Sequence, residues 1–434
     1  DKKFLFICGK GSNGLDGIYS CYKLKKLGYQ VNIISLDERN ISYLEKFEIK
    51  NNLIKDFKSD DFDCIVDCIF GYGFNRDLNS SYIKLINKIN SSRSFIYSVD
   101  VPTGLHPDTG KLCPISVRCD TLISLISYKR GIFTNQGRDT WRSLFFSNLI
   151  GKKITCRNYL ISANKSYSQS DLTKDYSQEN HYSQHKKTNG INCIISGERP
   201  YHGAMILSAE ASIKAGCQYL NIYTDEEYAL TLPMIIPEII AKPFSVDDFK
   251  ENIKNYKNIL IGPGMNKACE QYLEIILSNL NYIDSLVVDA GALKYLNKNH
   301  LYSHKLIITP HPGEAASLLG VKVSEVQNNR YKSAEMLHEI FDCIVVLKGS
   351  GTIIYDGKNF YTCMDGNYRM AVAGMGDVLS GILLQELSMG SEKLDSCIKA
   401  VTFHSYAADY LLNHTKKMNF TPSMIPDIYS NLVN

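Results

Sequence analysis

A short glycine-rich segment near the C-terminus has the residue types to bind a phosphate and to activate a hydroxyl. Residues 373–381 read Ala-Gly-Met-Gly-Asp-Val-Leu-Ser-Gly, so Gly374 and Gly376 precede Asp377, and the residues that follow suit the start of a helix. The backbone N–H groups of such a turn point toward one spot and form an anion site. Asp377 beside that site can take a proton from an attacking hydroxyl. The isolated motif also fits an ordinary helix start with an acidic first turn.

Four further segments of the second half end an apolar run with a glycine-containing turn. They cover residues 261–265, 288–293, 309–316 and 346–352. Five such turns in one chain order favour an active site over an isolated helix start. Two single residues keep simpler interpretations: His311, between two prolines, also fits a rigid turn, and Lys348 also fits a solvated surface charge.

The first 150 residues contain a second set of polar turns. Residues 8–17 read Cys-Gly-Lys-Gly-Ser-Asn-Gly-Leu-Asp-Gly, a loop suited to phosphate or ribose at a helix N-terminus. Asp67 and Asp100 close two later apolar runs, and residues 129–131, Lys-Arg-Gly, follow another. A glycine-rich loop alone is weak evidence, and both aspartates can also cap strand-end turns.

Strands that alternate with helices must position both sets of turns. We predict strands at 4–8, 31–36, 64–70, 95–101, 122–126, 191–196, 219–223, 258–261, 286–289, 306–309 and 344–347, and a long helix from about Asp377. This alternation predicts parallel sheets with crossover helices, which bind ligands at the carboxyl ends of their strands. We expect two α/β domains, 1–150 and 183–434. A polar linker at 151–182, rich in Ser, Tyr, Asn and Lys, is expected between them.

Composition and charge exclude several classes of protein. The 434 residues are enough for two or three domains, and 44% hydrophobic and 21% charged residues are ordinary for a globular protein. A net charge of +3 without a long basic run argues against nucleic acid or an acidic membrane as the main partner. No apolar stretch reaches about 18 residues, so no membrane span is expected. Thirteen scattered cysteines and no visible signal peptide predict reduced thiols in a cytoplasmic protein.

Together, the five turns of the second half resemble the ADP/ATP-dependent NAD(P)H-hydrate dehydratases, a branch of the ribokinase-like superfamily. The resemblance covers about residues 183–430 and rests on Pro-His-Pro-Gly-Glu-Ala at 310–315 and Gly-Met-Gly-Asp-Val-Leu-Ser-Gly at 374–381. It implies a ribokinase-like α/β domain. The hydroxyl at C6 of the hydrate would be phosphorylated by the nucleotide, and loss of phosphate would restore the nicotinamide. ADP is the expected donor, by analogy with fused bacterial chains, and Mg²⁺ is expected on the nucleotide phosphates.

The resemblance assigns roles to individual residues, with Asp377 as the catalytic base. The implied substrate contacts are Ala204, Gly264, His311, Gly313, Glu314 and Asp377. The implied nucleotide contacts are Lys348, Gly349, Ser350, Gly351, Thr352, Gly374 and Gly376. The sequence departs from the family where Tyr368 and Arg369 follow Asn367 in place of Pro-Gly, where Val372 replaces a common Thr, and at 215–218, Ala-Gly-Cys-Gln. These changes add bulk near the expected cofactor channel.

The turns of residues 1–150 resemble the NAD(P)H-hydrate epimerase domain, the usual partner of this dehydratase in one chain. The resemblance implies a Rossmann-like parallel sheet, and Asp100 as the acid/base that interconverts the R- and S-forms at C6. It also implies a potassium ion, a hard cation that prefers oxygen ligands, at Asn13, Asp67 and Thr103. The implied substrate contacts are Ser12, Asn13, Gly14, Leu15, Asp16, Gly71, Tyr72, Gly73, Phe74, Asn75, Arg76, Asp77 and Asp100.

The epimerase resemblance has departures, and two alternatives stay open. Where the family has Gly-Asn-Asn-Gly-Gly-Asp-Gly, Ser12 replaces the first Asn and Leu15 the second Gly of the pair, Tyr72 replaces a small residue, and Thr103 replaces Ser. One alternative is a vitamin or pyrimidine kinase of the ribokinase-like group, against which residues 310–315 argue. The other is a non-catalytic N-terminal domain that supports oligomerisation or nucleotide binding. The sequence leaves open the choice between ADP and ATP, the choice between NADH and NADPH, and the oligomeric state; a homo-oligomer is compatible with it.

Overall fold

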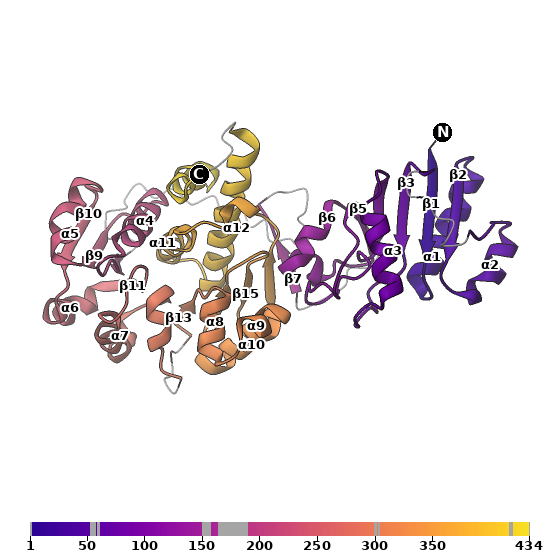
Figure 1. The fold of residues 1–434 in the computed structure, drawn as a ribbon. Helices are drawn as coiled ribbons and strands as arrows, with labels where there is room; N and C mark the ends of the chain where they lie inside the picture. The colour runs from indigo at the N-terminus through magenta and orange to yellow at the C-terminus, as the bar shows by residue number, and fades with distance from the viewer. Residues whose placement is uncertain are drawn as a thin grey trace. The chain divides into compact units, whose positions relative to one another are not determined.

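The computed structural model of the chain describes residues 2–52, 58, 61–149, 158–163, 190–298, 302, 304–415 and 420–433. It divides into two compact units, residues 1–156 and 157–434, each built around its own sheet (Figure 1). Among the described helices, none is both long and apolar enough to cross a bilayer.

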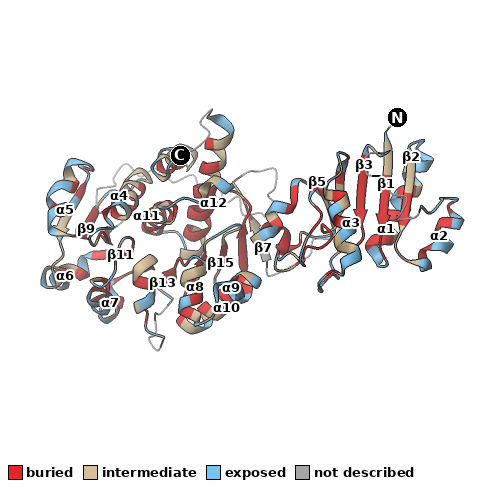
Figure 2. Cartoon of the chain, viewed as in Figure 1, coloured by how far each residue is buried: buried red, intermediate tan, exposed pale blue. Residues whose placement is uncertain are grey.

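The first unit contains a six-stranded sheet with the order β2-β1-β3-β4-β5-β6, in which every neighbouring pair is parallel. Its strands are β1 (Lys3–Cys8), β2 (Gln30–Ser35), β3 (Cys64–Cys68), β4 (Phe95–Val99), β5 (Cys119–Leu125) and β6 (Trp141–Ser147). Its helices are α1 (Ser12–Lys26), α2 (Ile41–Lys46) and α3 (Ser80–Asn90). The central β3 is buried along its whole length (Figure 2), as expected for a strand covered on both faces.

The second unit contains a ten-stranded sheet with the order β10-β9-β8-β11-β12-β13-β14-β15-β16-β7. The strands from β10 to β14 are parallel, β15 is antiparallel to both neighbours, and β7 is parallel to β16. The strands are β7 (Asn158–Ile161), β8 (Ile191–Ile195), β9 (Leu220–Thr224), β10 (Ile239–Pro243), β11 (Tyr256–Ile261), β12 (Ser285–Val288), β13 (Leu306–Ile308), β14 (Ile344–Leu347), β15 (Ile353–Tyr355) and β16 (Phe360–Cys363).

Helices cover both faces of the larger sheet. The helices are α4 (His202–Lys214), α5 (Glu226–Thr231), α6 (Val246–Asn252), α7 (Cys269–Ser278), α8 (Pro312–Leu319), α9 (Val323–Asn328), α10 (Arg330–Phe341), α11 (Met375–Ser388), α12 (Lys393–His414) and α13 (Ile425–Val433). Buried side chains of α6 to α10 form one core, and those of α4 and α11 to α13 form the other. Helices α11 and α4 pack closely at Gly381: a Cβ there would come within 2.2 Å of the Ser208 carbonyl oxygen, so the absence of a side chain permits this approach.

The predicted strands are all present within a few residues, and the prediction of parallel α/β sheets is confirmed. The sequence analysis missed β6, β10, β15, β16 and β7. Strand β7 lies inside residues 151–182, so the linker prediction is wrong for 158–161. This four-residue edge strand is held by pairing with β16, and its own short sequence carries too weak a signal. Ser162 and Ala163 continue from this strand and donate hydrogen bonds to Asp365. The remaining linker residues, 151–157 and 164–182, lie outside the described residues.

Candidate active sites

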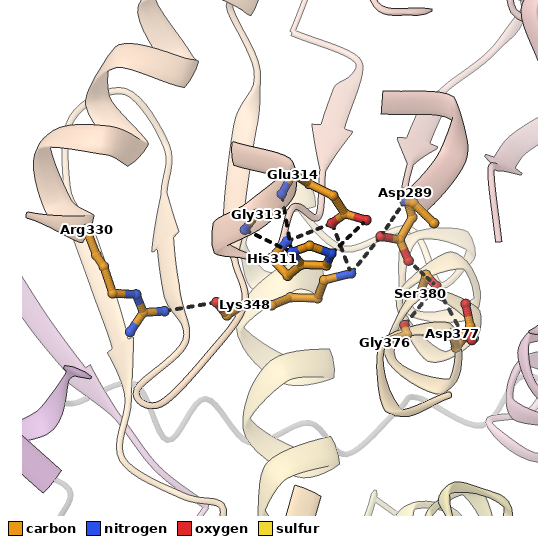
Figure 3. A network of polar contacts seen from close by, with 10 residues as sticks. Asp289, His311, Gly313, Glu314, Arg330, Lys348, Gly376, Asp377 and Ser380 are labelled. Atoms are coloured by element: carbon orange, nitrogen blue, oxygen red, sulfur yellow. Dashed lines mark hydrogen bonds and ion pairs between the residues drawn. The ribbon is translucent and has the colours of Figure 1, made fainter. Parts of the chain in front are cut away.

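The polar turns of the second unit come together at the carboxyl ends of neighbouring parallel strands (Figure 3). Asp289 follows β12, residues 309–314 follow β13, and Lys348 follows β14. Asp377 lies in the first turn of α11. Parallel sheets bind their ligands at this edge, because the crossover connections leave the strand ends accessible there.

Lys348 is the cation at the centre of this cluster. Its Nζ donates a hydrogen bond to Oδ1 of Asp289 over 2.7 Å and lies 4.0 Å from Oε2 of Glu314. A Cβ at position 376 would be 3.1 Å from this Nζ, so Gly376 leaves room for the ammonium group. Burial alone would lower the pKa of Lys348, but the charges of Asp289, Glu314 and Asp377 raise it above its ordinary value. Lys348 is therefore a cation at neutral pH.

Asp377 has the properties of a general base. Burial raises its pKa to about 6, the charges of Asp289 and Glu314 act in the same direction, and Lys348 opposes them. Within the described residues, no hydrogen-bond donor reaches its carboxylate, which is consequently free to accept a proton from a ligand. A carboxylate with a pKa near the working pH is well suited to this task.

Asp289 connects Lys348 to helix α11, a role that the sequence analysis did not assign. Its side chain is 1% exposed, and its Oδ1 accepts hydrogen bonds from Lys348 and from the Ala290 amide. Its Oδ2 accepts from the Ser380 hydroxyl over 3.0 Å. Its place in the turn at 288–293 could have indicated this role, because a carboxylate directly after a buried parallel strand lies at the carboxyl end of the strand, where ligands bind.

His311 is the N-cap of helix α8 and part of the same cluster. Its Nδ1 accepts hydrogen bonds from the amides of Gly313 and Glu314 over 3.0 and 3.2 Å, and its own amide donates to Oε2 of Glu314 over 2.8 Å. This capping box fixes the turn after β13. Because Nδ1 accepts, the proton of a neutral ring is assigned to Nε2, which lies 3.4 Å from Oε1 of Glu314. Burial raises the pKa of Glu314.

Close backbone packing brings the predicted contacts Ala204, Gly264 and Gly374 together around the start of α4. Gly264 has a φ of +59°, and a Cβ there would come within 2.3 Å of the Tyr201 carbonyl oxygen and 3.0 Å of the Ala204 Cβ. Gly374, with a φ of +93°, would place a Cβ 2.4 Å from Leu207, one turn further along α4. Only glycine fits both positions without strain.

The first unit has a pocket of about 690 Å³ at the carboxyl ends of its strands. Of the predicted contacts, its lining includes Ser12, Asn13, Asp16, residues 71–76 and Asp100. Gly14, Leu15 and Asp77 are not part of the lining. Leu15 instead packs against the apolar core around α1, which is where its bulk is accommodated.

Asp100 is held firmly in this pocket. It adopts a φ of +71°, which is rare for a residue other than glycine, and such strain is often found at functional sites. Its Oδ2 accepts the Tyr72 amide over 2.8 Å, and its Oδ1 forms an ion pair with Lys129. Lys129 is 8% exposed, lines the pocket and also donates to the Leu125 carbonyl. The segment 129–131 was singled out in the sequence, but Lys129 was given no role.

Asp67 lies in β3, whose carboxyl end borders the pocket, and is 1% exposed. It accepts hydrogen bonds from the Ser98 hydroxyl, the Ile69 amide, and the amide and hydroxyl of Thr103. Burial nevertheless raises its pKa. The side-chain amide of Asn13 donates to the carbonyl oxygens of Phe70 and Val99, and the Phe70 amide in turn donates to the Thr103 hydroxyl. The Oδ1 of Asn13 is buried and has no partner among the described residues.

Comparison with known proteins matches both units to one family. A model described as NAD(P)H-hydrate dehydratase matches residues 192–430, and one described as YjeF-related protein N-terminus matches residues 1–131. The bifunctional NAD(P)H-hydrate repair enzyme of Vibrio cholerae is 33% identical over 80% of this chain and 70% of that protein. The Escherichia coli enzyme of the same name is 30% identical over 94% of this chain and 81% of that protein.

The chain belongs to the family of bifunctional NAD(P)H-hydrate repair enzymes. Among solved structures, the ADP/ATP-dependent NAD(P)H-hydrate dehydratase of Bacillus subtilis, co-crystallised with ATP and Mg²⁺, is 26% identical over 58% of this chain and 92% of that chain, with a TM-score of 0.52. A ribokinase-like superfamily protein of Enterococcus faecalis matches with a TM-score of 0.56 at 22% identity over 65% of this chain and 97% of that one, which shows the fold. The prediction of a ribokinase-like second domain is confirmed.

Each of the two clusters of polar residues falls within one of the matched domains of the NAD(P)H-hydrate repair family. The cluster around Asp377 lies within the dehydratase match, and the pocket around Asp100 lies within the N-terminal match. The predicted residues Lys348, His311, Glu314 and Asp377 are brought together by the fold. Their individual roles, and those of the residues lining the first pocket, remain predictions.

Proposed function

We propose that this chain repairs hydrated NAD(P)H in two steps, with the second unit dehydrating the S-form and the first unit interconverting the R- and S-forms. The observation that carries the proposal is the Asp377 carboxylate at the start of α11, which has a raised pKa, lies near Lys348 and accepts no hydrogen bond from the described residues. The membership of the repair-enzyme family supports it.

In the dehydration, Asp377 takes the proton of the C6 hydroxyl, and the resulting oxygen attacks the terminal phosphorus of the nucleotide. The bond from that phosphorus to the bridging oxygen breaks, so ADP leaves as AMP and ATP leaves as ADP. Phosphate then leaves C6 and a proton leaves C5, taken up by the departing phosphate or by water, and the C5–C6 double bond is restored. Lys348 and the amides at the start of α11 stabilise the negative charge on the phosphate oxygens.

The donor set around Lys348 fits a magnesium ion. Asp289, Glu314 and Asp377 bring three carboxylates to a single lysine, and Mg²⁺ is bound by carboxylate and phosphate oxygens. Asp289 is already bonded to Lys348 and Ser380, and Oε2 of Glu314 accepts the His311 amide, so these carboxylates would hold the ion through water while the phosphates supply its direct ligands. The ion would screen the phosphate charges. We propose ADP as the main donor.

In the first unit, Asp100 and Lys129 face the proposed hydrate, and Asp100 moves the proton during epimerisation at C6. Neighbouring residues fit a potassium ion. The buried Oδ1 of Asn13 has no partner within the described residues, and Asp67 is a buried carboxylate that accepts hydrogen bonds but forms no ion pair in the described part of the chain, so a cation near Asn13, Asp67 and Thr103 would give the Asn13 oxygen a partner and offset the charge of Asp67. Such an ion would supply charge compensation and hold the loop that carries Thr103.

The experiment is incubation of the purified full chain with each separated epimer of hydrated NADH and with ADP or ATP and Mg²⁺. We expect the absorbance of NADH to return with the S-form, and with the R-form through epimerisation. A stable phosphate ester without NADH would instead establish a kinase of the ribokinase-like group. Recovery from the S-form alone would show that the N-terminal domain is not a working epimerase.

Other expectations stay predictions. The described cysteines are buried free thiols, in keeping with a reducing, cytoplasmic location. The substrates proposed for the chain are the hydrate and an adenine nucleotide, and the sequence gives no reason to expect nucleic acid or a membrane as a partner.

A further inference from the structure

Arg330 is a buried cation that the proposed reaction does not use. It is the first residue of α10, and its side chain is only 1% exposed. Burial lowers its pKa to about 10, so it is charged at neutral pH. A buried guanidinium is costly unless many acceptors surround it. Its acceptors therefore indicate why it is there.

These acceptors are backbone carbonyls of the loop that carries Lys348. One guanidinium nitrogen donates to the carbonyl oxygens of Leu347 and Lys348 over 3.0 and 3.1 Å. A second donates to the carbonyls of Ser350 and Gly351, the latter over 3.0 Å. Figure 3 shows Arg330 reaching the backbone of Lys348 from the side away from Asp289 and Asp377. The planar fork of an arginine can reach several carbonyls at once, which a lysine cannot.

The loop backbone is shaped around this guanidinium. Gly349 has a φ of +138°, and a Cβ there would be 3.0 Å from a nitrogen of Arg330. Gly351 has a φ of +63°. Both conformations disfavour residues with a side chain, and at position 349 the arginine itself occupies the space.

Turning these carbonyls toward Arg330 turns the amides the other way, because the C=O and N–H of a trans peptide point in opposite directions. The amides opposite the carbonyls of Lys348 and Ser350 are those of Gly349 and Gly351. Within the described part of the chain, neither amide has an acceptor. They are available to an anion on the face of the loop opposite to Arg330.

We infer that Arg330 is a positioning residue for the nucleotide: it fixes the loop of residues 347–351 so that the amides of Gly349 and Gly351, with Lys348, present donors to the phosphates. This deepens the proposed function and rests on it. Arg330 does not touch the nucleotide itself. Its loss therefore weakens nucleotide binding more than binding of the hydrate.

The test compares Arg330→Met and Arg330→Lys with the unchanged full chain, using calorimetric titration with MgADP and, in parallel, MgATP. We expect Arg330→Met to raise the Kd of the nucleotide by about tenfold or more, as loss of positioning commonly does. Arg330→Lys, which keeps the charge and some donors, is expected to recover part of the affinity. In steady-state assays, the KM for nucleotide should rise while the KM for the hydrate stays unchanged.

Lys305→Met is the matched control. Lys305 also holds two backbone carbonyls, of Leu280 and Ile283, over 2.8 and 2.7 Å. It precedes β13, at the strand end opposite to the site. Its loss is expected to lower the melting temperature without changing the Kd for nucleotide.

Three results would decide the inference. An unchanged nucleotide Kd in a folded Arg330→Met protein overturns it. If Arg330→Met does not fold, an unchanged Kd in Arg330→Lys overturns it equally. If the unchanged chain binds neither nucleotide and returns no NADH, the proposed function itself fails. If the unchanged chain is active and the Arg330 variants bind the nucleotide as tightly as it does, only this inference fails.

Discussion

Each unit places one aspartate at its proposed ligand site, and the two aspartates differ in their hydrogen-bond and ion-pair partners. In the second unit, Asp377 has no hydrogen-bond donor among the described residues, and the nearby lysine is bound to a different carboxylate, Asp289. In the first unit, Asp100 is itself paired with the buried Lys129 and with a backbone amide. Similar sheets thus place a carboxylate at the carboxyl ends of their strands and surround it with different partners.

This difference suits different chemistry. A base that removes a hydroxyl proton once per turnover benefits from a pKa raised toward neutrality, which burial and like charges supply at Asp377. Inversion at C6, a carbon that carries both a hydroxyl and the ring nitrogen, requires a bond to one of these atoms to break and re-form while a proton is given and taken back, so an acid and a base near each other are useful. Asp100 and Lys129 meet that requirement as a pair. Variants of each aspartate and of its neighbours test this contrast.

Asp377→Asn should lower the dehydratase rate by about 10²–10⁴-fold, the usual contribution of a general base. Epimerisation should be unchanged, because Asp377 belongs to the other unit. The NADH absorbance reports the first reaction, and chromatography of the two epimers reports the second. A variant that keeps dehydration within a factor of about ten of wild type would remove Asp377 from the mechanism.

Lys129→Met should slow epimerisation by roughly 10²-fold and leave dehydration of the S-form intact, because Asp100 loses its partner. The control is Arg142→Met: Arg142 pairs with Asp120 over 3.1 Å but is 84% exposed, so its loss should affect neither reaction. Equal epimerisation rates in both variants would contradict a joint role of Asp100 and Lys129.

The dehydratase should lose activity below about pH 6, the pKa of Asp377. The ionised form is the active base, so kcat/KM should fall about tenfold for each further unit of acidity. Profiles of kcat/KM at saturating nucleotide would show the limb. A limb near pH 4, the ordinary range of an aspartate, would mean that burial and its neighbours do not raise this pKa in solution.

The smallest effect concerns stability. A carboxyl whose pKa is raised on folding contributes stability below its unfolded pKa and loses it as the pH rises through about 6. Asp377→Asn should therefore stabilise the second unit by about 1–3 kcal/mol at pH 8 and by little at pH 4. Asp100→Asn should instead destabilise the first unit, because it removes the carboxylate partner of the buried Lys129. Melting curves at the two pH values distinguish these signs.

The sequence predicted those parts of the sites that follow an apolar strand directly. Lys348, Glu314 and Asp377 were found because a strand or helix start next to a glycine turn is a local signal. Arg330 was missed because its partners are backbone carbonyls 17 to 21 residues away, which leave no trace in residue types. Lys129 was missed for a related reason: its contact with Asp100 depends on two strand ends meeting.

The same reasoning explains the fold. Strands such as β1 and β11 are runs of apolar residues that any buried strand requires, and they were predicted within two residues. Strands β15 and β16 are only three and four residues long and antiparallel. They lie outside the strand–helix alternation on which the prediction relied. Their pairing depends on neighbours distant in sequence and not on their own pattern.

Strand β7 has a practical consequence for dividing the chain. Tyr159 stacks on Tyr361 of β16 at 5.1 Å, and Ile161 is buried in the core beneath α12. A fragment that starts at residue 183 would leave backbone N–H and C=O groups of β16 unpaired at the edge of the sheet, where they can pair with another copy of the fragment. A gene fragment meant to yield the second catalytic half as a stand-alone reagent should therefore begin upstream of Asn158, even though the composition there looks dispensable.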